Sequence, residues 1–93
     1  MPRFPLLVLV LFLSSCGLSR EEFHDLVEQS RACGPGEECV LAGSSQCTCP
    51  TPVNEKHRER IEEAAAEVRC GGAMVDCAFF ESVACEAGRC VGR

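Results

Sequence analysis

The stretch Cys47-Thr48-Cys49-Pro50-Thr51-Pro52-Val53-Asn54 lies near the middle of the chain and decides how the rest is arranged. It holds two cysteines separated by one residue. Residues i and i+2 of a strand lie about 7 Å apart at Cα, close to the limit that a disulfide tolerates. We therefore expect Cys47 and Cys49 to bond to two different, distant partners and so to join this stretch to two other parts of the fold.

A β-hairpin is predicted just before and within this stretch. Residues 37–42 read as a strand, Gly43-Ser44-Ser45 as a turn, and residues 46–49 as the returning strand. Pro50-Thr51-Pro52 is expected to end the hairpin, because proline has no N–H to donate to a strand ladder.

A helix is predicted directly after the stretch, from residue 55 to about residue 69. Asn54 is a favourable N-cap, and the residues that follow are mostly good helix formers. One face of this helix is expected to pack on the sheet, and its members are His57, Ile61, Ala64, Ala65 and Val68. Gly71-Gly72 is expected to end the helix after Cys70.

The last third of the chain predicts three more strands. Residues 74–78, which include Cys77, read as one strand, and residues 83–85 and 89–91 read as a final hairpin. The predicted fold class is therefore α+β: a small disulfide-rich domain with a three- or four-stranded antiparallel sheet and one packed helix, preceded by a short N-terminal helix.

The turn of the final hairpin bears on the disulfide pairing. A two-residue turn would force Ala87 to a positive φ, which its Cβ disfavours, so a type I turn with Gly88 in the left-handed region is expected. In that register Cys85 and Cys90 point to opposite faces. We therefore predict that they belong to different disulfides.

Eight cysteines lie within the last 61 residues. This density is typical of small exported domains, where an oxidising environment favours disulfides. The bulky apolar residues of this region are few, so four bridges, each contributing about 2–4 kcal/mol, are expected to supply much of the stability. The spacing leaves the pairing open. The eight are Cys33, Cys39, Cys47, Cys49, Cys70, Cys77, Cys85 and Cys90.

The first fifteen residues have the pattern of an export signal. A short start that contains Arg3 is followed by an apolar run over residues 4–13, too short for a spanning helix, which needs about 20 residues. Leu13-Ser14-Ser15-Cys16 resembles the lipobox of bacterial lipoproteins. The resemblance implies cleavage before Cys16, a diacylglycerol on its sulfur and a fatty acyl group such as palmitate on its amino group. An ordinary signal peptide with an unmodified Cys16 is the alternative, and the even number of remaining cysteines favours lipidation.

The same resemblance predicts a location in the bacterial cell envelope. Gly17, directly after Cys16, resembles the outer-membrane sorting signal of those lipoproteins, and either face of that membrane stays open. Residues 16–93 lack only Arg3 of the nine basic residues, so they carry eight basic against fourteen acidic side chains, a formal charge of −6. Nucleic acid and anionic headgroups are therefore poor partners for the surface. The expected membrane contact is the lipid on Cys16.

A short helix is predicted over residues 20–32. Ser19-Arg20-Glu21-Glu22 forms a capping box, and Phe23, Leu26, Val27 and Ser30 recur on one face. This helix is either packed on the disulfide domain or a spacer. The predicted organisation is a signal peptide (1–15), a lipidated N-terminus with helical spacer (16–32) and a disulfide-rich domain (33–93). His24 is expected to be a solvated side chain beside Glu28.

The eight-cysteine spacing, with Cys47 to Asn54 leading into a helix that contains His57, resembles the small bacterial lipoproteins known as eight-cysteine-cluster proteins. The resemblance covers residues 33–93. It implies an exported disulfide-rich domain, and it carries no catalytic residues or mechanism.

Catalytic and metal readings find little support in the residues. Cys47 and Cys49 could act as a redox pair, since closely spaced thiols of lowered pKa exchange disulfides, but no thioredoxin-like pattern surrounds them. The cysteines with His57 could bind zinc, but the usual paired C-x2–4-C knuckles are missing. His57 is instead expected to pack near the helix start, with its ring nitrogens bonded to backbone. Two histidines in separate helices do not assemble a hydrolytic site. We predict no enzyme activity, cofactor or metal.

Protein binding is the function that this composition favours. Small disulfide scaffolds present rigid loops, and rigidity lowers the ordering cost of binding. The candidate loops are Gly43-Ser44-Ser45, Thr51-Pro52-Val53 and Phe79-Phe80-Glu81-Ser82. Phe79 and Phe80 cannot both face one core if they are extended, so one is a candidate anchor; a short helical turn would instead bury both. The expected partner is an envelope or extracellular protein, and a contribution to the structure of the envelope surface is the other non-catalytic role. Inhibition of a secreted protease is the alternative binding function, and redox action through Cys47 and Cys49 is the alternative from another class.

Overall fold

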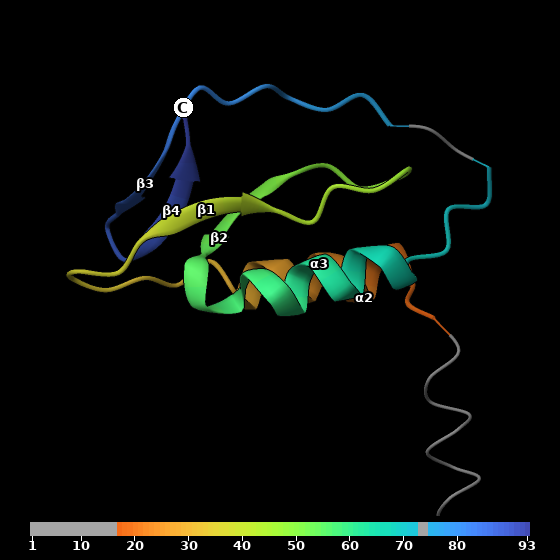
Figure 1. Ribbon diagram of the computed structural model, residues 1–93, viewed down its shortest axis with the longest axis horizontal. Coiled ribbons are helices and arrows are strands. Elements are labelled where there is room, and N and C mark those ends of the chain that lie inside the picture. The colour runs from red at the N-terminus through yellow and green to blue at the C-terminus, as the bar shows by residue number, and fades with distance from the viewer. Residues whose placement is uncertain (1–16, 73–74) are drawn as a thin grey trace, which may run out of the picture.

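The structure is a computed structural model that describes residues 17–72 and 75–93. The predicted signal segment, Cys16 and Met74 lie outside the described residues. The fold class is confirmed: within the described residues, two α-helices and four strands form a small α+β domain closed by disulfides (Figure 1). The elements are α2 (Arg20–Gln29), β1 (Cys39–Ala42), β2 (Thr51–Asn54), a 3₁₀ turn η1 (Glu55–His57), α3 (Arg58–Glu67), β3 (Val83–Glu86) and β4 (Arg89–Gly92).

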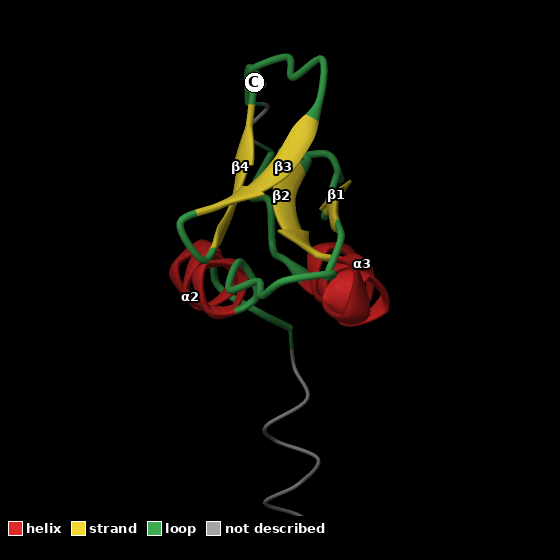
Figure 2. Ribbon diagram, turned by 90° about the vertical axis from the view of Figure 1, so that its left-hand side faces the viewer, coloured by secondary structure: helices red, strands yellow, loops and turns green. Residues whose placement is uncertain are grey.

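The helices form one layer and the strands lie above them, as Figures 1 and 2 both show. The strands form two separate two-stranded antiparallel sheets, β1–β2 and β3–β4, rather than one continuous sheet. The backbone that follows α2 lies between the two sheets. The N–H of Asn54 donates to the carbonyl of Ser30 at 2.8 Å, and the N–H of Cys90 donates to the carbonyl of Arg31 at 2.7 Å. These bonds join β2 and β4 through the segment after α2.

The hydrophobic core lies between the helix layer and the β1–β2 sheet. Val53 of β2 and Ile61 of α3 are both 0% exposed. Helix α2 contributes Phe23 and Val27 to this cluster, so it packs on the domain. Its predicted capping box is confirmed, since the Ser19 hydroxyl accepts from the N–H of Glu22 at 3.1 Å and the Glu22 carboxylate accepts from the N–H of Ser19 at 3.3 Å.

The returning strand of the first hairpin is β2, at residues 51–54, and the prediction of residues 46–49 is wrong. Residues 43–50 form the connecting loop instead. The Thr48 hydroxyl donates to the Gly43 carbonyl at 2.6 Å, and Cys47 is drawn into the core by its disulfide to Cys70. These two constraints bend the loop inward where a strand was expected.

Pro52 lies inside β2, although proline was expected to end the hairpin. It pairs with Leu41 of β1. Residues 52 and 54 share an orientation in the strand, and the N–H of Asn54 faces away from β1, toward Ser30. The nitrogen of Pro52 therefore also faces away from β1, so its missing N–H removes no bond from the ladder.

The second helix follows the prediction closely. Asn54 caps it, since its side-chain oxygen accepts from the N–H of Lys56 at 3.1 Å, although the first turn is 3₁₀. Four of the five predicted packing residues are buried: Ile61, Ala64, Ala65 and Val68. The helix ends at Glu67, two residues early, because Val68 turns to an extended conformation and pairs with Leu18 in a parallel bridge.

The turn of the last hairpin differs from the prediction. Glu86 pairs with Arg89, so the turn has two residues, with Ala87 at φ 52 and Gly88 at φ 80. A two-residue turn of this kind matches the twist of the flanking strands, which outweighs a cost of about 1–2 kcal/mol for the Ala87 conformation. Cys85 therefore lies directly opposite Cys90. The two cysteines still belong to different disulfides, as predicted. The predicted reason, that they point to opposite faces of the hairpin, is wrong.

The eight cysteines form four disulfides with Cα separations of 5.4–6.0 Å. The pairs are Cys33–Cys85, Cys39–Cys90, Cys47–Cys70 and Cys49–Cys77. Cys47 and Cys49 do take separate distant partners. Four disulfides indicate an oxidising environment outside the cytoplasm. Within residues 17–72 and 75–93, the helices are too short and too polar to span a bilayer.

The strand predicted over residues 74–78 is not formed in its described part. Residues 75–80 have no regular secondary structure. In this part of the chain Cys77 is held by its disulfide to Cys49, and no neighbouring strand supplies a ladder to residues 75–78 among the described residues. A β-propensity pattern without such a partner gives an irregular segment.

Candidate protein-binding site

The segment Val75–Phe80, here called the strap, crosses the molecule on the side of the strands opposite to the helices (Figure 1). Its middle is attached through the Cys49–Cys77 disulfide, whose Cα atoms are 5.4 Å apart. After the strap, the N–H of Ser82 donates to the carbonyl of Arg93 at 3.2 Å, and the N–H of Arg93 donates back to Ser82 at 3.0 Å. The strap is thus fixed at an internal point and at its C-terminal end.

The two phenylalanines of the strap have different surroundings. Phe80 is half-buried, and its ring packs so closely on Gly92 that a Cβ at residue 92 would overlap it. Phe79 is 89% exposed, whereas the other exposed large apolar side chains of the described residues, Leu41 and Val75, are 37% and 36% exposed. The packing of Phe80 holds the backbone that carries Phe79, and it leaves the Phe79 ring in solvent.

A groove of about 410 Å³ runs between α2 and the Cys47–Thr51 segment. Phe23, Val27 and Cys47 contribute apolar lining, and Val75 of the strap also borders it. Cys49 also lines the groove. The polar lining residues are Arg20, His24, Glu28, Arg31, Thr48 and Thr51. The groove and the strap therefore share Val75, and the Cys49–Cys77 bridge connects the two.

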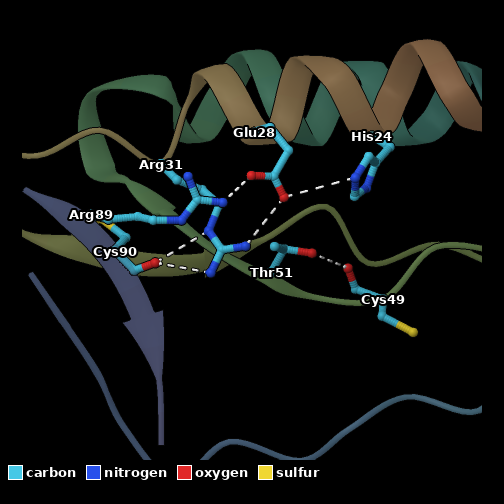
Figure 3. A network of polar contacts seen from close by, with 7 residues as sticks. All are labelled: His24, Glu28, Arg31, Cys49, Thr51, Arg89 and Cys90. Atoms are coloured by element: carbon cyan, nitrogen blue, oxygen red, sulfur yellow. Dashed lines mark hydrogen bonds and ion pairs between the residues drawn. The ribbon is translucent and has the colours of Figure 1, made fainter. Parts of the chain in front are cut away.

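Glu28 of α2 is the centre of a polar network that borders the groove (Figure 3). Its carboxylate accepts from the guanidinium of Arg89 on β4 and lies 3.4 Å from Nη1 of Arg31. Arg31 in turn donates from Nε and Nη2 to the carbonyl of Cys90, at 3.2 and 3.1 Å. The network therefore attaches the C-terminal hairpin to the helix layer.

The electrostatics of this network favour an ionised Glu28. The hydrogen bond from Arg89 is the main cause that lowers the pKa of the Glu28 carboxyl below its ordinary value of 4.5, with further lowering by the charges of Arg89 and Arg31. A second carboxyl pKa, that of Glu37, is lowered mainly by the hydrogen bond from Lys56 and then by the N–H of Gly34. Both arrangements are ordinary for surface ion pairs that fix loop geometry.

The two histidines lie on different elements, His24 on α2 and His57 in η1, and they share no partner among the described residues. His24, on α2, is exposed, with Nε2 3.9 Å from Glu28, as the sequence predicted. His57, at the end of η1, is half-buried. Among the described residues its ring makes no hydrogen bond, so the predicted bonds to backbone are not seen in this part of the chain. The 3₁₀ turn places His57 one turn away from the buried face that begins at Ile61.

In residues 17–72 and 75–93 every cysteine sulfur is engaged in a disulfide. The Sγ atoms of Cys33, Cys39 and Cys85 lie within 4.8 Å of one another, a spacing that reduced thiolates could use for a metal ion. They belong to two disulfides, so they offer no thiolate in this oxidised form. Cys47 and Cys49 are not bonded to each other, so the reversible pair needed for the redox alternative is not formed either.

Of the two candidate loops other than the phenylalanine segment, one is a strand and the other is a loop whose first residue is anchored in the fold. Residues 51–53 belong to β2, and Pro52 and Val53 are buried. Gly43 is also buried, and its N–H donates to the Glu62 carboxylate at 3.1 Å. Ser44 of that loop is exposed but small and polar, so the phenylalanine segment is the candidate that presents a large apolar side chain to solvent.

No protein-family model, curated protein or solved structure matches this chain. The site must therefore be interpreted from its own chemistry. Sequence reasoning singled out Phe79 and Phe80 but missed the groove, because it depends on the packing of α2 and on the path of residues 43–50. The recurrence of Arg20, His24, Glu28 and Arg31 along one side of the first helix was the available signal.

Proposed function

We propose that this chain is a lipid-anchored protein of the bacterial envelope, held in the outer membrane through Cys16, whose disulfide-closed domain binds another envelope or extracellular protein without catalysis. The observation that carries the binding role is the 89% exposure of Phe79 on a strap fixed by the Cys49–Cys77 bridge and by the packing of Phe80. Large aromatic side chains dominate the energetics of protein interfaces. A fixed backbone reduces the entropy lost when such a residue enters a pocket.

The lipid anchor is supported by the lipobox-like Leu13-Ser14-Ser15-Cys16 and by the even number of cysteines that remain when Cys16 is set aside. All eight of those are paired within the domain. Several acyl chains, at about 0.8 kcal/mol per buried methylene, would make membrane attachment effectively permanent.

The binding role is tested by site-specific photo-crosslinking in cells. A photoreactive phenylalanine analogue replaces Phe79 in the full chain, and the matched control places it at Leu41, a partly exposed apolar residue on β1. We expect one adduct of defined mass from position 79 and none from position 41. The purified wild-type protein should suppress this adduct by competition, and the F79A variant should not. If position 79 gives no adduct, or one that F79A suppresses equally, Phe79 is not the anchor.

A second candidate is inhibition of a secreted protease. The observation that favours it is that Phe79 follows the bridged Cys77 by two residues on an irregular, solvent-exposed segment, so a protease with an apolar specificity pocket could accept it. This predicts inhibition of a protease that cleaves after aromatic residues, loss of inhibition in F79A, and retention in L41A. F79R should move the inhibition to proteases that cleave after basic residues. Degradation of the strap without inhibition would rule this candidate out.

A further inference from the structure

The described chain is engaged in the fold from its first residues. The N–H of Leu18 donates to the carbonyl of Glu67 at 3.0 Å, and the N–H of Arg69 donates to the carbonyl of Leu18 at 3.1 Å. Leu18 also packs against the core, and Ser19 caps α2. These bonds attach the start of the chain to the C-terminal end of α3. The region between residue 16 and the first helix is therefore not a spacer.

Gly17 takes part in the same junction. Its φ is +98°, and a Cβ on this residue would lie 3.2 Å from the carbonyl oxygen of Glu67 and 3.4 Å from Cγ of Arg69. A positive φ and close contact with backbone favour glycine at this position. The junction thus gives a structural reason for glycine at position 17, in addition to the proposed sorting role. It also places the residue after Cys16 directly against the fold.

We infer that the junction end, formed by Gly17, Leu18, Glu67, Val68 and Arg69, rests on the lipid headgroups, so that the strap faces away from the membrane. This inference depends on the proposed lipidation of Cys16. Consecutive Cα atoms are about 3.8 Å apart, so the acylated residue would lie within one peptide unit of Gly17. A tether this short does not allow the domain to reorient freely over the bilayer.

The arrangement of the elements decides which surfaces are then exposed. In Figure 1 the described chain enters at the helix layer and the strap crosses beyond the strands. The loop between α2 and β1 (residues 30–38) extends to the end of the molecule opposite the junction end. Residues 16–93 carry a formal charge of −6, so electrostatic attraction to anionic lipid does not produce this orientation. Because the covalent tether produces it, the orientation should be the same on neutral and anionic vesicles.

Tryptophan quenching tests the orientation, because the chain has no Trp and no Tyr. The lipidated protein, purified from bacterial membranes, is placed in phosphatidylcholine vesicles that contain a lipid with a nitroxide on its headgroup. Single Trp residues are introduced at exposed positions: R69W and E67W at the junction end, P35W at the far end and F79W on the strap. We expect at least about twofold quenching at residues 67 and 69, within the roughly 10 Å headgroup zone, and little at residues 35 and 79.

A lengthened tether provides the matched control. A twelve-residue Gly/Ser insert between Cys16 and Gly17, beginning with Gly, has an r.m.s. length of about 20 Å. It should remove most of the quenching at residues 67 and 69 while the protein stays bound to vesicles. Equal quenching at all four positions, or none, in acylated protein would overturn the orientation. An intact mass that shows an unmodified Cys16 would instead overturn the proposed anchor itself.

Discussion

At the scale of single residues, Gly43 illustrates how little space the core leaves. It follows β1 with φ +93°, and a Cβ there would lie 2.9 Å from Cγ2 of Ile61 and 3.0 Å from Cζ of Phe23. The backbone therefore approaches both helices at this point. Only a residue without a side chain allows α2, α3 and the β1–β2 loop to meet.

The G43A variant should lose about 2–4 kcal/mol of unfolding free energy, from the positive φ together with overpacking against Ile61 and Phe23. Gly36 is the matched control, because its φ is +80° but nothing lies within 4 Å of an added Cβ. G36A should lose about 1–2 kcal/mol, from the φ alone. Urea unfolding of the oxidised protein measures both. Equal losses would show that contact with the helices is not the cause.

Glu28 gives a pH-dependent prediction at the same scale. Its pKa is lowered in the folded protein, so the ionised carboxylate stabilises the fold above its ordinary value of 4.5, and this contribution is lost as pH falls through the lower, folded pKa. The partly exposed pairs with Arg89 and Arg31 are worth about 0.5–1 kcal/mol at neutral pH. E28Q should therefore be less stable than wild type by this amount at pH 7, and the difference should shrink as pH falls below 4.5.

Urea titrations at several pH values measure this difference. E63Q is the control, because Glu63 is exposed on α3 and has no ion pair within the described residues. It should show no such pH-dependent difference from wild type. A stability gap between E28Q and wild type that persists at acidic pH would mean that the network acts through packing and not through charge.

At the scale of elements, the disulfides Cys47–Cys70 and Cys49–Cys77 have different roles. They close segments of similar length, with sequence separations of 23 and 28 residues, so chain entropy predicts about 3.5 kcal/mol for each. Cys47 lies in the core cluster, whereas Cys77 is exposed on the strap. The two disulfides therefore differ in their contacts with the core, which Cys47–Cys70 makes through Cys47.

Replacing Cys47 and Cys70 together by alanine should therefore destabilise the domain by more than replacing Cys49 and Cys77, with an added loss of about 1–2 kcal/mol from the buried sulfur. The second variant should instead speed hydrogen exchange or proteolytic cleavage at residues 75–79 while the helices stay protected. Urea unfolding and limited proteolysis measure the two effects. If cleavage of the strap is unchanged, the bridge does not hold it.

The same scale shows what the sequence could predict. The capping box at Ser19, the Asn54 cap and the buried face from Ile61 to Val68 follow from local patterns, so they were predictable. The returning strand was misplaced because Cys47 is pulled inward by Cys70 and because Pro52 directs its nitrogen away from β1. Both effects depend on residues far along the chain. Phe79 was recognised as a candidate anchor, but the groove beside α2 required the packing of three separate segments.

For the whole molecule, the domain has two parts that are stabilised differently. The helices and the β1–β2 sheet share the hydrophobic core. In the C-terminal hairpin, residues 83–92, Cys90 is the one buried residue, and it lies outside that core cluster. That hairpin is held by two disulfides, by the bonds to residues 31–33 and by the Glu28 network. Covalent bonds therefore replace apolar burial in this half.

This division predicts the order in which the disulfides are reduced. A thiol must reach a sulfur to attack it, so exposed bridges react first. Cys85 and Cys77 are exposed, whereas Cys90 is 0% and Cys47 4% exposed. Cys33–Cys85 and Cys49–Cys77 should therefore be reduced before Cys39–Cys90 and Cys47–Cys70 when the native protein meets a mild thiol reductant.

Timed alkylation followed by peptide mass mapping measures this order. We expect helical circular dichroism to persist through loss of the two exposed bridges and to fall when Cys47–Cys70 opens, because that bridge crosses the shared core. Addition of urea is the control: once the fold is lost, burial no longer protects any sulfur, so the four bridges should be reduced at similar rates. Early reduction of Cys47–Cys70 in the native protein would contradict the burial on which the order depends. If the helical signal is lost when the first exposed bridge is reduced, the core is not stable without the disulfides that attach the hairpin and the strap.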